Sequence, residues 1–550
     1  STITAALSML NLPPLNVMDK AKLPVTLADG QVDLNGTLSF PLKKGGGPDA
    51  LRYDATGILR DVKSDTLIKD RVLASKSMTV TASNDEVRIG GPGRLDAVEF
   101  DAIWSQRIGP EHAGKSTVRG TVELSERTLD TFKIALPPGS VTGRGTGDFA
   151  LDLIRDAPPQ LRLTSDLRGL KIAATPVGWV KPAATPGALV VAGTLGAVAD
   201  VSELSLSGPG LSANGAVSLK GDGTLDRVRI DQLKVGNWLD APVDLVGRGS
   251  GAVPGVVLRG GTLDLRAATF GGPDGGETGT AVPLDLNLDR LQVTDTIAIT
   301  AMRGEFISRA GLDGRFTGRV NDGTAITGQL VPENGRSAVL ITTPDAGGVI
   351  ASAGILNQAR GGDLSLTLRP VGPNSAFDGI LGITGTSVQD APVMAALLNA
   401  LSGVGLLNEL NGDGIYFNQV EAAFRISPNR ITLTQASAVG PSMGLSMDGI
   451  YVPDQGVLNM QGVISPIYLL NGIGSIFTRK GEGLIGFNYQ LSGPAKSPNV
   501  SVNPLSVLTP AMFRNLFRAP APKAPAVEGE AVKPAAEPPK PRVEVSGPDR

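Results

Sequence analysis

The sequence predicts a mostly β protein: a long, curled antiparallel β-sheet that forms a groove, with a few short helices near the C-terminus. Over most of its 550 residues, short segments alternate apolar and polar side chains, the pattern of half-buried strands. These segments stop at turn-forming residues, and the chain holds 71 Gly and 40 Pro. Apolar residues at helical spacing are found in few places. Strands therefore dominate the prediction.

Each predicted strand has one apolar face and one polar face. Turns roughly every 10 to 13 residues allow on the order of 40 strands, too many for a compact sandwich. The sequence has too few helices to cover such a sheet, and aromatic residues make up only 4% of it. We therefore expect a smooth aliphatic groove, with lining candidates Val32, Leu34, Leu38, Phe40, Phe149, Leu151, Leu153, Leu204, Leu206, Val217, Leu219, Leu284, Leu286 and Leu288.

A loose internal similarity accompanies the alternation. Residues 204–219 (LSLSGPGLSANGAVSL) resemble residues 436–451 (ASAVGPSMGLSMDGIY), with a fainter copy at residues 302–320. The period is irregular, which indicates a repeated meander of strands and not a strict solenoid.

Helical periodicity is confined to the C-terminal third, at residues 392–407, 467–477 and 509–518. Two interpretations of these helices stay open: they cap the end of the sheet, or they touch a membrane. The candidates for membrane contact are Leu397, Leu398, Leu401, Val404, Phe513 and Phe517. From residue 519 to residue 550 the composition shifts to Pro, Ala, Lys and Glu, which predicts a disordered or polyproline-like tail.

The composition excludes several chemistries. With no Cys and one His, His112, the chain cannot form a disulfide, a Cys or His₂ zinc site or a haem-thiolate site. A net charge of −3 and the lack of a dense basic cluster argue against a nucleic-acid partner. We expect no catalytic residue, metal or cofactor. The longest apolar runs, of about 15 residues, fall short of a membrane span.

The sequence contains one match to a nucleotide-binding motif. Residues 109–116 (GPEHAGKS) fit the Walker A pattern, whose chemistry requires a helix that begins at the Lys and Ser. Alternating segments precede and follow this motif, so we expect a loop between strands and no nucleotide site.

The C-terminal region resembles that of large AsmA-like envelope proteins of Gram-negative bacteria. The resemblance rests on residues 390–398 (DAPVMAALL), 411–417 (NGDGIYF), 440–445 (GPSMGL), 486–493 (GFNYQLSG) and 498–505 (PNVSVNPL). The earlier part, with LPPL at residues 12–15, GGPG at residues 90–93 and the strand bearing Trp104, is similar to the segment preceding that region. The corresponding domains are residues 1–390, the groove; 391–518, the AsmA-like region; and 519–550, the tail.

This resemblance implies a repeating β-groove of the bridge-like lipid-transfer type. The implied function is non-enzymatic phospholipid transfer between the inner and outer membranes, in support of outer-membrane integrity. The implied location is the periplasm, with an inner-membrane tether through an N-terminal helix outside this chain. The implied partners are phospholipid acyl chains, the two membranes and envelope proteins.

The residues themselves leave two alternative functions open. The same sheet could serve as an assembly or structural factor for outer-membrane proteins, binding protein strands at its edges without lipid transport. A β-helical surface or carbohydrate-active protein would need clustered carboxylates and aromatic platforms for sugars. The 3 Trp and 5 Tyr are scattered, which disfavours the second alternative.

Overall fold

The computed structural model describes residues 1–13, 16–39, 52–196, 199–268, 281–372, 376–400, 410, 414–466, 480–483, 485–495, 497–508 and 518–526. These residues form 31 strands and a few short helices, so the predicted fold class is confirmed. The strand number is below the expected 40 because many strands are 9 to 14 residues long. The chain divides into two compact units, residues 1–309 (unit 1) and residues 310–550 (unit 2).

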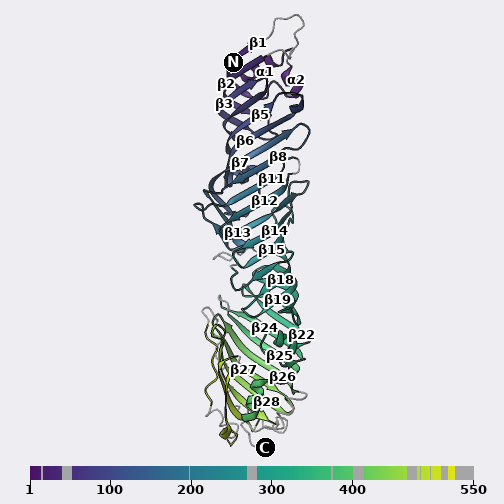
Figure 1. The fold of residues 1–550 in the computed structure, drawn as a ribbon, viewed down its shortest axis with the longest axis vertical. Coiled ribbons are helices and arrows are strands. Elements are labelled where there is room, and N and C mark those ends of the chain that lie inside the picture. The colour runs from purple at the N-terminus through teal and green to yellow at the C-terminus, as the bar shows by residue number, and fades with distance from the viewer. Residues whose placement is uncertain are drawn as a thin grey trace, which may run out of the picture. The chain divides into compact units, whose positions relative to one another are not determined.

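Unit 1 is a long, largely antiparallel sheet whose strands mostly pair with their neighbours in the chain (Figure 1). Strand β8 pairs directly with β11, while β9 and β10 form a side sheet on β7. Strands β16 and β17 lie in line and pair in parallel with β18. The strands are β1 (Asp29–Ser39), β2 (Arg52–Ser64), β3 (Leu73–Ser83), β4 (Glu86–Leu95), β5 (Val98–Arg107), β6 (Lys115–Ser125), β7 (Val141–Ile154), β8 (Gln160–Ser165), β9 (Leu170–Ala174), β10 (Trp179–Lys181), β11 (Ala188–Thr194), β12 (Asp200–Gly208), β13 (Leu211–Leu219), β14 (Leu225–Val235), β15 (Leu239–Val246), β16 (Gly255–Leu258), β17 (Thr262–Asp264), β18 (Val282–Gln292) and β19 (Ala298–Ser308).

The helices of unit 1 are α1 (Ile3–Leu10), α2 (Val17–Ala21) and α3 (Glu126–Phe132). None of these three helices was predicted, because the helical periodicity found in the sequence was confined to the C-terminal third. Thr2 caps α1 by accepting a hydrogen bond from the Ala5 N–H at 3.2 Å. Ile3 of α1 packs on Val32 and Val62, so the helix covers the apolar face at β1 and β2. The described part of residues 133–309 contains no α-helix.

Helix α3 is fixed to β6 through the buried Glu123 carboxylate. It accepts hydrogen bonds from Arg127 at 2.7 Å, from Arg144 at 2.7 Å and from the Ser125 hydroxyl at 2.6 Å. Burial raises the pKa of Glu123, but the hydrogen bonds from Arg127, Ser125 and Arg144 outweigh it and hold the pKa below its ordinary value. The carboxylate therefore stabilises the fold in its charged form.

We expect Glu123→Gln to lower the free energy of unfolding of unit 1 by about 1–2 kcal/mol at pH 7, because two arginines lose their charge partner. A carboxyl with a lowered folded-state pKa adds stability above its unfolded-state pKa, and this is lost as the pH falls through the folded-state value. The difference between variant and parent should therefore shrink below about pH 4. Urea unfolding at pH 7 and at acidic pH measures it. Glu99→Gln, at an exposed carboxylate beside Arg144, is the control; an equal loss there would contradict the assignment.

The strands of unit 2 pair antiparallel with one another, and the described ones are β20 (Leu312–Val320), β21 (Ala325–Glu333), β22 (Arg336–Thr343), β23 (Ala359–Arg360), β24 (Asp363–Val371), β25 (Ala376–Val388), β26 (Ile415–Ser427), β27 (Arg430–Val439), β28 (Met443–Val452), β29 (Val457–Pro466), β30 (Phe487–Pro494) and β31 (Asn499–Asn503). Its described helices are α4 (Ala346–Ser352) and α5 (Pro392–Ala400). The two similar segments found in the sequence are the β12–β13 and β27–β28 hairpins. The predicted boundary at residue 390 falls inside unit 2, between β25 and α5.

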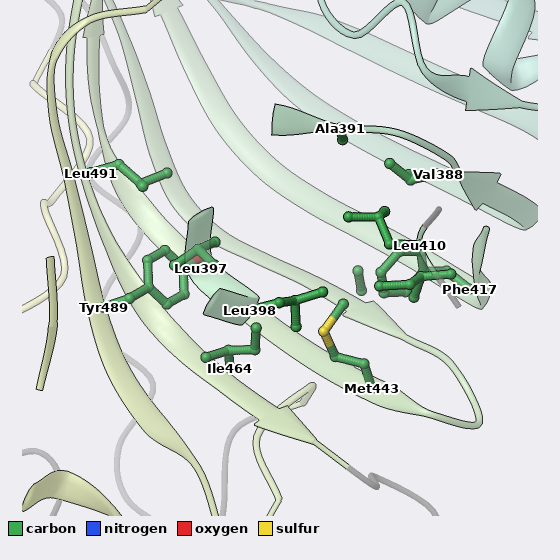
Figure 2. Packing of buried hydrophobic residues seen from close by; sticks show 12 residues of the cluster. Val388, Ala391, Leu397, Leu398, Leu410, Phe417, Met443, Ile464, Tyr489 and Leu491 are labelled. Carbon is green, nitrogen blue, oxygen red and sulfur yellow. The ribbon is translucent and has the colours of Figure 1, made fainter. Parts of the chain in front are cut away.

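The apolar side of the unit 2 sheet is a closed core. Leu397 and Leu398 of α5 are 3% and 0% exposed and pack with Met443, Ile464 and Tyr489 (Figure 2). The labelled side chains converge on the inner side of the curved strands. Ala346 of α4 packs in the same way on Leu364 and Ile383, strand residues of a second cluster. Helices thus cover this sheet, which contrasts with most of unit 1.

Candidate apolar groove of unit 1

The strand registers of unit 1 align apolar residues from strand to strand. Residues directly opposite each other in a ladder share one face of the sheet. Following such pairs from β1 to β19 gives an unbroken row through sixteen strands, which we call the first apolar row. It comprises Leu34, Gly57, Val80, Ile89, Trp104, Val118, Leu151, Leu161, Gly193, Val201, Val217, Val228, Leu245, Val256, Leu284 and Phe306.

A second apolar row lies two residues away along most of the same strands. It comprises Gly91, Ala102, Gly120, Phe149, Leu163, Val191, Leu204, Gly215, Ile230, Val243, Leu258, Leu286 and Gly304. Neither row contains a charged or polar side chain. At a strand spacing of about 4.8 Å, the first row follows a path of about 70 Å, over twice the ~30 Å hydrocarbon thickness of a bilayer.

The exposure of the first row distinguishes it from an ordinary core. Of its fourteen side chains, twelve are half-buried, while Leu34 is 46% exposed and Phe306 is 4% exposed. Side chains in a closed core are nearly all inaccessible, as Leu397 and Leu398 are in unit 2. From β1 to β18 the first row is therefore partly sheltered by its neighbours in the sheet and remains accessible; only Phe306, at its end on β19, is buried.

The opposite face of the same strands is polar and charged. There Arg229 pairs across the ladder with Asp244, and Asp285 with Glu305. The buried Asp244 carboxylate forms ion pairs with Arg227 at 3.0 Å and with Arg259 at 2.9 Å. These pairs satisfy the charge where it is desolvated. The two faces thus differ in kind, as the alternation predicted.

Local twist is introduced by irregular pairing along β11 to β15. Register shifts occur between Val201 and Leu204, between Asn214 and Gly215, and between Ile230 and Leu233. Each inserts extra residues on one strand, which bends the strand and increases the twist. At Gly215 a side chain would lie 1.9 Å from the Arg229 carbonyl oxygen, so only glycine permits this close pairing.

The structure brings most of the predicted lining residues onto this one face. Leu34, Leu151, Val217 and Leu284 belong to the first row, and Phe149, Leu204 and Leu286 to the second. The remaining candidates extend the same face two or four residues farther along their strands: Val32, Leu38, Leu153, Leu206, Leu219 and Leu288. Phe40 lies outside the described residues.

Sequence reasoning missed several members of the rows, such as Trp104, Leu163 and Leu245. All three lie in alternating segments of β5, β8 and β15, so the pattern that identified the other strands also marks them. What the pattern could not supply was the register that aligns them.

The described candidates for membrane contact lie in unit 2 and not on the apolar face of unit 1. Leu397 and Leu398 are buried in the core of unit 2, which favours the interpretation that their helix caps the sheet. Leu401, Val404, Phe513 and Phe517, and the predicted helices at 467–477 and 509–518 almost entirely, lie outside the described residues. Within the described part of the chain, no helix has the length and apolarity needed to span a membrane.

The Walker-like motif lies between two strands, as expected. A three-residue 3₁₀ turn (Pro110–His112) follows Gly109, and β6 begins at Lys115. His112 contacts its neighbour Glu111, with the Nε2 and Oε1 atoms 3.3 Å apart. An α-helix N-terminus, which gives the P-loop its row of phosphate-binding amides, does not follow the motif here.

We expect Lys115→Ala to change the free energy of unfolding by less than about 0.5 kcal/mol, because Lys115 is an exposed strand residue. The substitution should also leave ligand binding unchanged. Thermal melting with and without Mg-ATP checks this. ATP binding by the parent chain that the variant lacks would overturn the interpretation of the motif.

No protein-family model, no curated protein and no solved structure matches the chain. The similarity to AsmA-like proteins therefore rests on the sequence motifs quoted above.

Proposed function

We propose that the chain is a non-enzymatic conduit for phospholipid acyl chains, which move along the apolar face of unit 1 between the inner and outer membranes of a Gram-negative envelope. The observation that carries the proposal is the first apolar row: sixteen aligned residues, none of them charged, most of them half-buried. The periplasmic location, the inner-membrane tether and the support of outer-membrane integrity belong to the proposal through the resemblance to AsmA-like proteins.

The energetics explain why such a face would be useful. Moving two acyl chains of ~16 carbons into water costs on the order of 25 kcal/mol, at about 0.8 kcal/mol per methylene. A continuous face of apolar residues removes most of this cost along the path. Adjacent positions offer similar chemistry, so a lipid would meet no deep trap between them. The face lowers a barrier and supplies no direction.

Two measurements on the purified full chain test the proposal. Lipid extraction with quantitative mass spectrometry should find phospholipid bound at more than one molecule per chain. A fluorescence assay between donor and acceptor vesicles should show faster phospholipid transfer when the chain is added. A chain that carries no lipid and does not accelerate transfer would contradict the conduit. If that chain instead binds peptides from outer-membrane strands, the assembly-factor alternative gains support.

A further inference from the structure

On β27, β28 and β29 the polar face of the unit 2 sheet is buried although its residues are hydrophilic. Thr432, Ser446, Asp448 and Ser465 lie on β27, β28 and β29 and are at most 4% exposed. They alternate with core residues such as Met447 and Ile464, so they point to the other side of the sheet. Part of what covers this side comes from the C-terminal residues 518–526.

Arg518 anchors this segment. Its side chain is 6% exposed and lies between two buried carboxylates, those of Asp448 and Glu482. Nη1 donates to Glu482 Oε1 at 2.9 Å, and Nη2 donates to Asp448 Oδ2. The Ser446 hydroxyl donates to the same Glu482 oxygen at 2.8 Å. Two buried carboxylates that hold one guanidinium form a specific, charge-assisted binding site. We call Asp448 and Glu482 together the Arg518 socket.

The rest of the segment is held at two backbone positions. Gln461 Nε2 donates to the Ala519 carbonyl at 2.7 Å and to Asp448 Oδ1 at 2.9 Å. Arg425, itself paired with Asp378 at 2.6 Å, donates to the Pro525 carbonyl at 2.8 Å. Residues 518–526 form neither helix nor strand.

The span between these contacts fits an extended proline-rich chain. The six residue steps from Ala519 to Pro525 cover about 19 Å as polyproline II. Gln461 lies on β29 and Arg425 on β26, three strand spacings or about 14 Å apart across the sheet, with a further offset along the strands. The segment therefore crosses the strands nearly extended.

We propose that this polar face is a docking site for an arginine-headed, proline-rich segment, and that residues 518–526 occupy it as an exchangeable strap. Three features make the strap releasable. Pro520, Pro522 and Pro525 donate no backbone hydrogen bond, so the contacts are few. Beyond the buried side chain of Arg518, residues 519–526 are half-buried or exposed. Arg518 Nε is buried without a hydrogen-bond partner in the described part of the chain, a cost that release relieves.

The test uses the full chain, which has no Cys, so that Lys523→Cys introduces a single labelling position on an exposed residue of the strap. A fluorophore there should show high anisotropy. A synthetic peptide of residues 518–526 should displace the strap and lower the anisotropy at concentrations on the order of millimolar, since a short tether gives a comparable effective concentration. The same peptide with Arg518→Ala should need at least tenfold more.

Substitutions in the chain supply the second arm. Arg518→Ala and Glu482→Gln should each free the label, and Arg430→Ala, at an exposed arginine on β27, should not. Three outcomes would overturn the proposal: a label that is already mobile in the parent, a label that excess peptide leaves unchanged, or equal displacement by the two peptides. The peptide arm needs no folding-sensitive substitution, so it decides the matter even where a variant is unstable.

Discussion

Replacing Leu398 by Asp is expected to unfold unit 2. Leu398 is 0% exposed and lies among Met443, Ile464 and Leu410 in a core with no access for water (Figure 2). A carboxylate there is desolvated without a partner, and the cavity left by the lost methyl groups adds to the cost. We expect a loss of more than about 4 kcal/mol, a large part of the 5–15 kcal/mol that stabilises a typical domain.

The aromatic residues allow this loss to be located. All three tryptophans, Trp104, Trp179 and Trp238, lie in unit 1, so the near-ultraviolet dichroism of Tyr489 and the other tyrosines of unit 2 can be followed apart from tryptophan fluorescence. The Tyr489 hydroxyl donates to the Ser446 carbonyl at 2.8 Å, and burial raises the pKa of Tyr489, so its signal depends on an intact core. In Leu398→Asp the tyrosine signal should collapse.

Ala396→Asp is the matched control, since Ala396 is an exposed residue of the same helix. It should change the free energy of unfolding of unit 2 by less than about 1 kcal/mol. The membrane interpretation of α5 would be restored if the parent chain binds liposomes and the Leu398→Asp variant keeps its tyrosine signal but no longer binds them.

The strands of unit 1 were predictable because a two-residue period is a local property. In β18, Leu284, Leu286 and Leu288 alternate with polar residues, and no distant contact is needed to recognise the strand. The register is not local. That β8 skips two strands to pair with β11 depends on long-range closure of the sheet, so the first apolar row could not be traced from the sequence.

The helices also depend on contacts between residues far apart in the sequence. Helix α4 contains Gly347 and Gly348, poor helix formers, and tertiary packing overrides their propensity. A side chain at Gly347 would lie 2.4 Å from the Arg360 backbone, so the helix approaches β23 only because this residue is glycine. In the same way, the Arg518 socket joins residues 36 and 70 positions apart, which no local pattern reveals.

Leu286→Asp is expected to block lipid movement while leaving unit 1 folded. Leu286 is half-buried in the second apolar row, where it lies opposite Leu258 on one side and Gly304 on the other. Gly304 contributes no side chain and Leu286 is itself only half-buried, so the new carboxylate can stay hydrated. We expect a stability loss of about 1–2 kcal/mol, against more than about 3 kcal/mol in a closed core.

For an acyl chain the same substitution is a larger obstacle. A hydrated carboxylate in the path must be desolvated, or the chain must leave the face to pass it. A barrier increase of about 3 kcal/mol corresponds to a transfer rate lower by more than a hundredfold. Asn287→Asp adds the same charge one residue away, on the exposed polar face opposite Arg303, and should leave transfer unchanged.

The paired variants separate an open groove from an ordinary core. Tryptophan-detected melting reports the stability of unit 1, and vesicle-to-vesicle transfer reports the path. An open aliphatic path requires two results. Leu286→Asp should melt at nearly the parent temperature but lose transfer, and Asn287→Asp should behave like the parent chain in both assays. If Leu286→Asp alone strongly lowers the melting temperature, the face is closed to both water and lipid. Equal loss of transfer in both variants would point to a general effect of negative charge, because only one of the two positions lies on the apolar face.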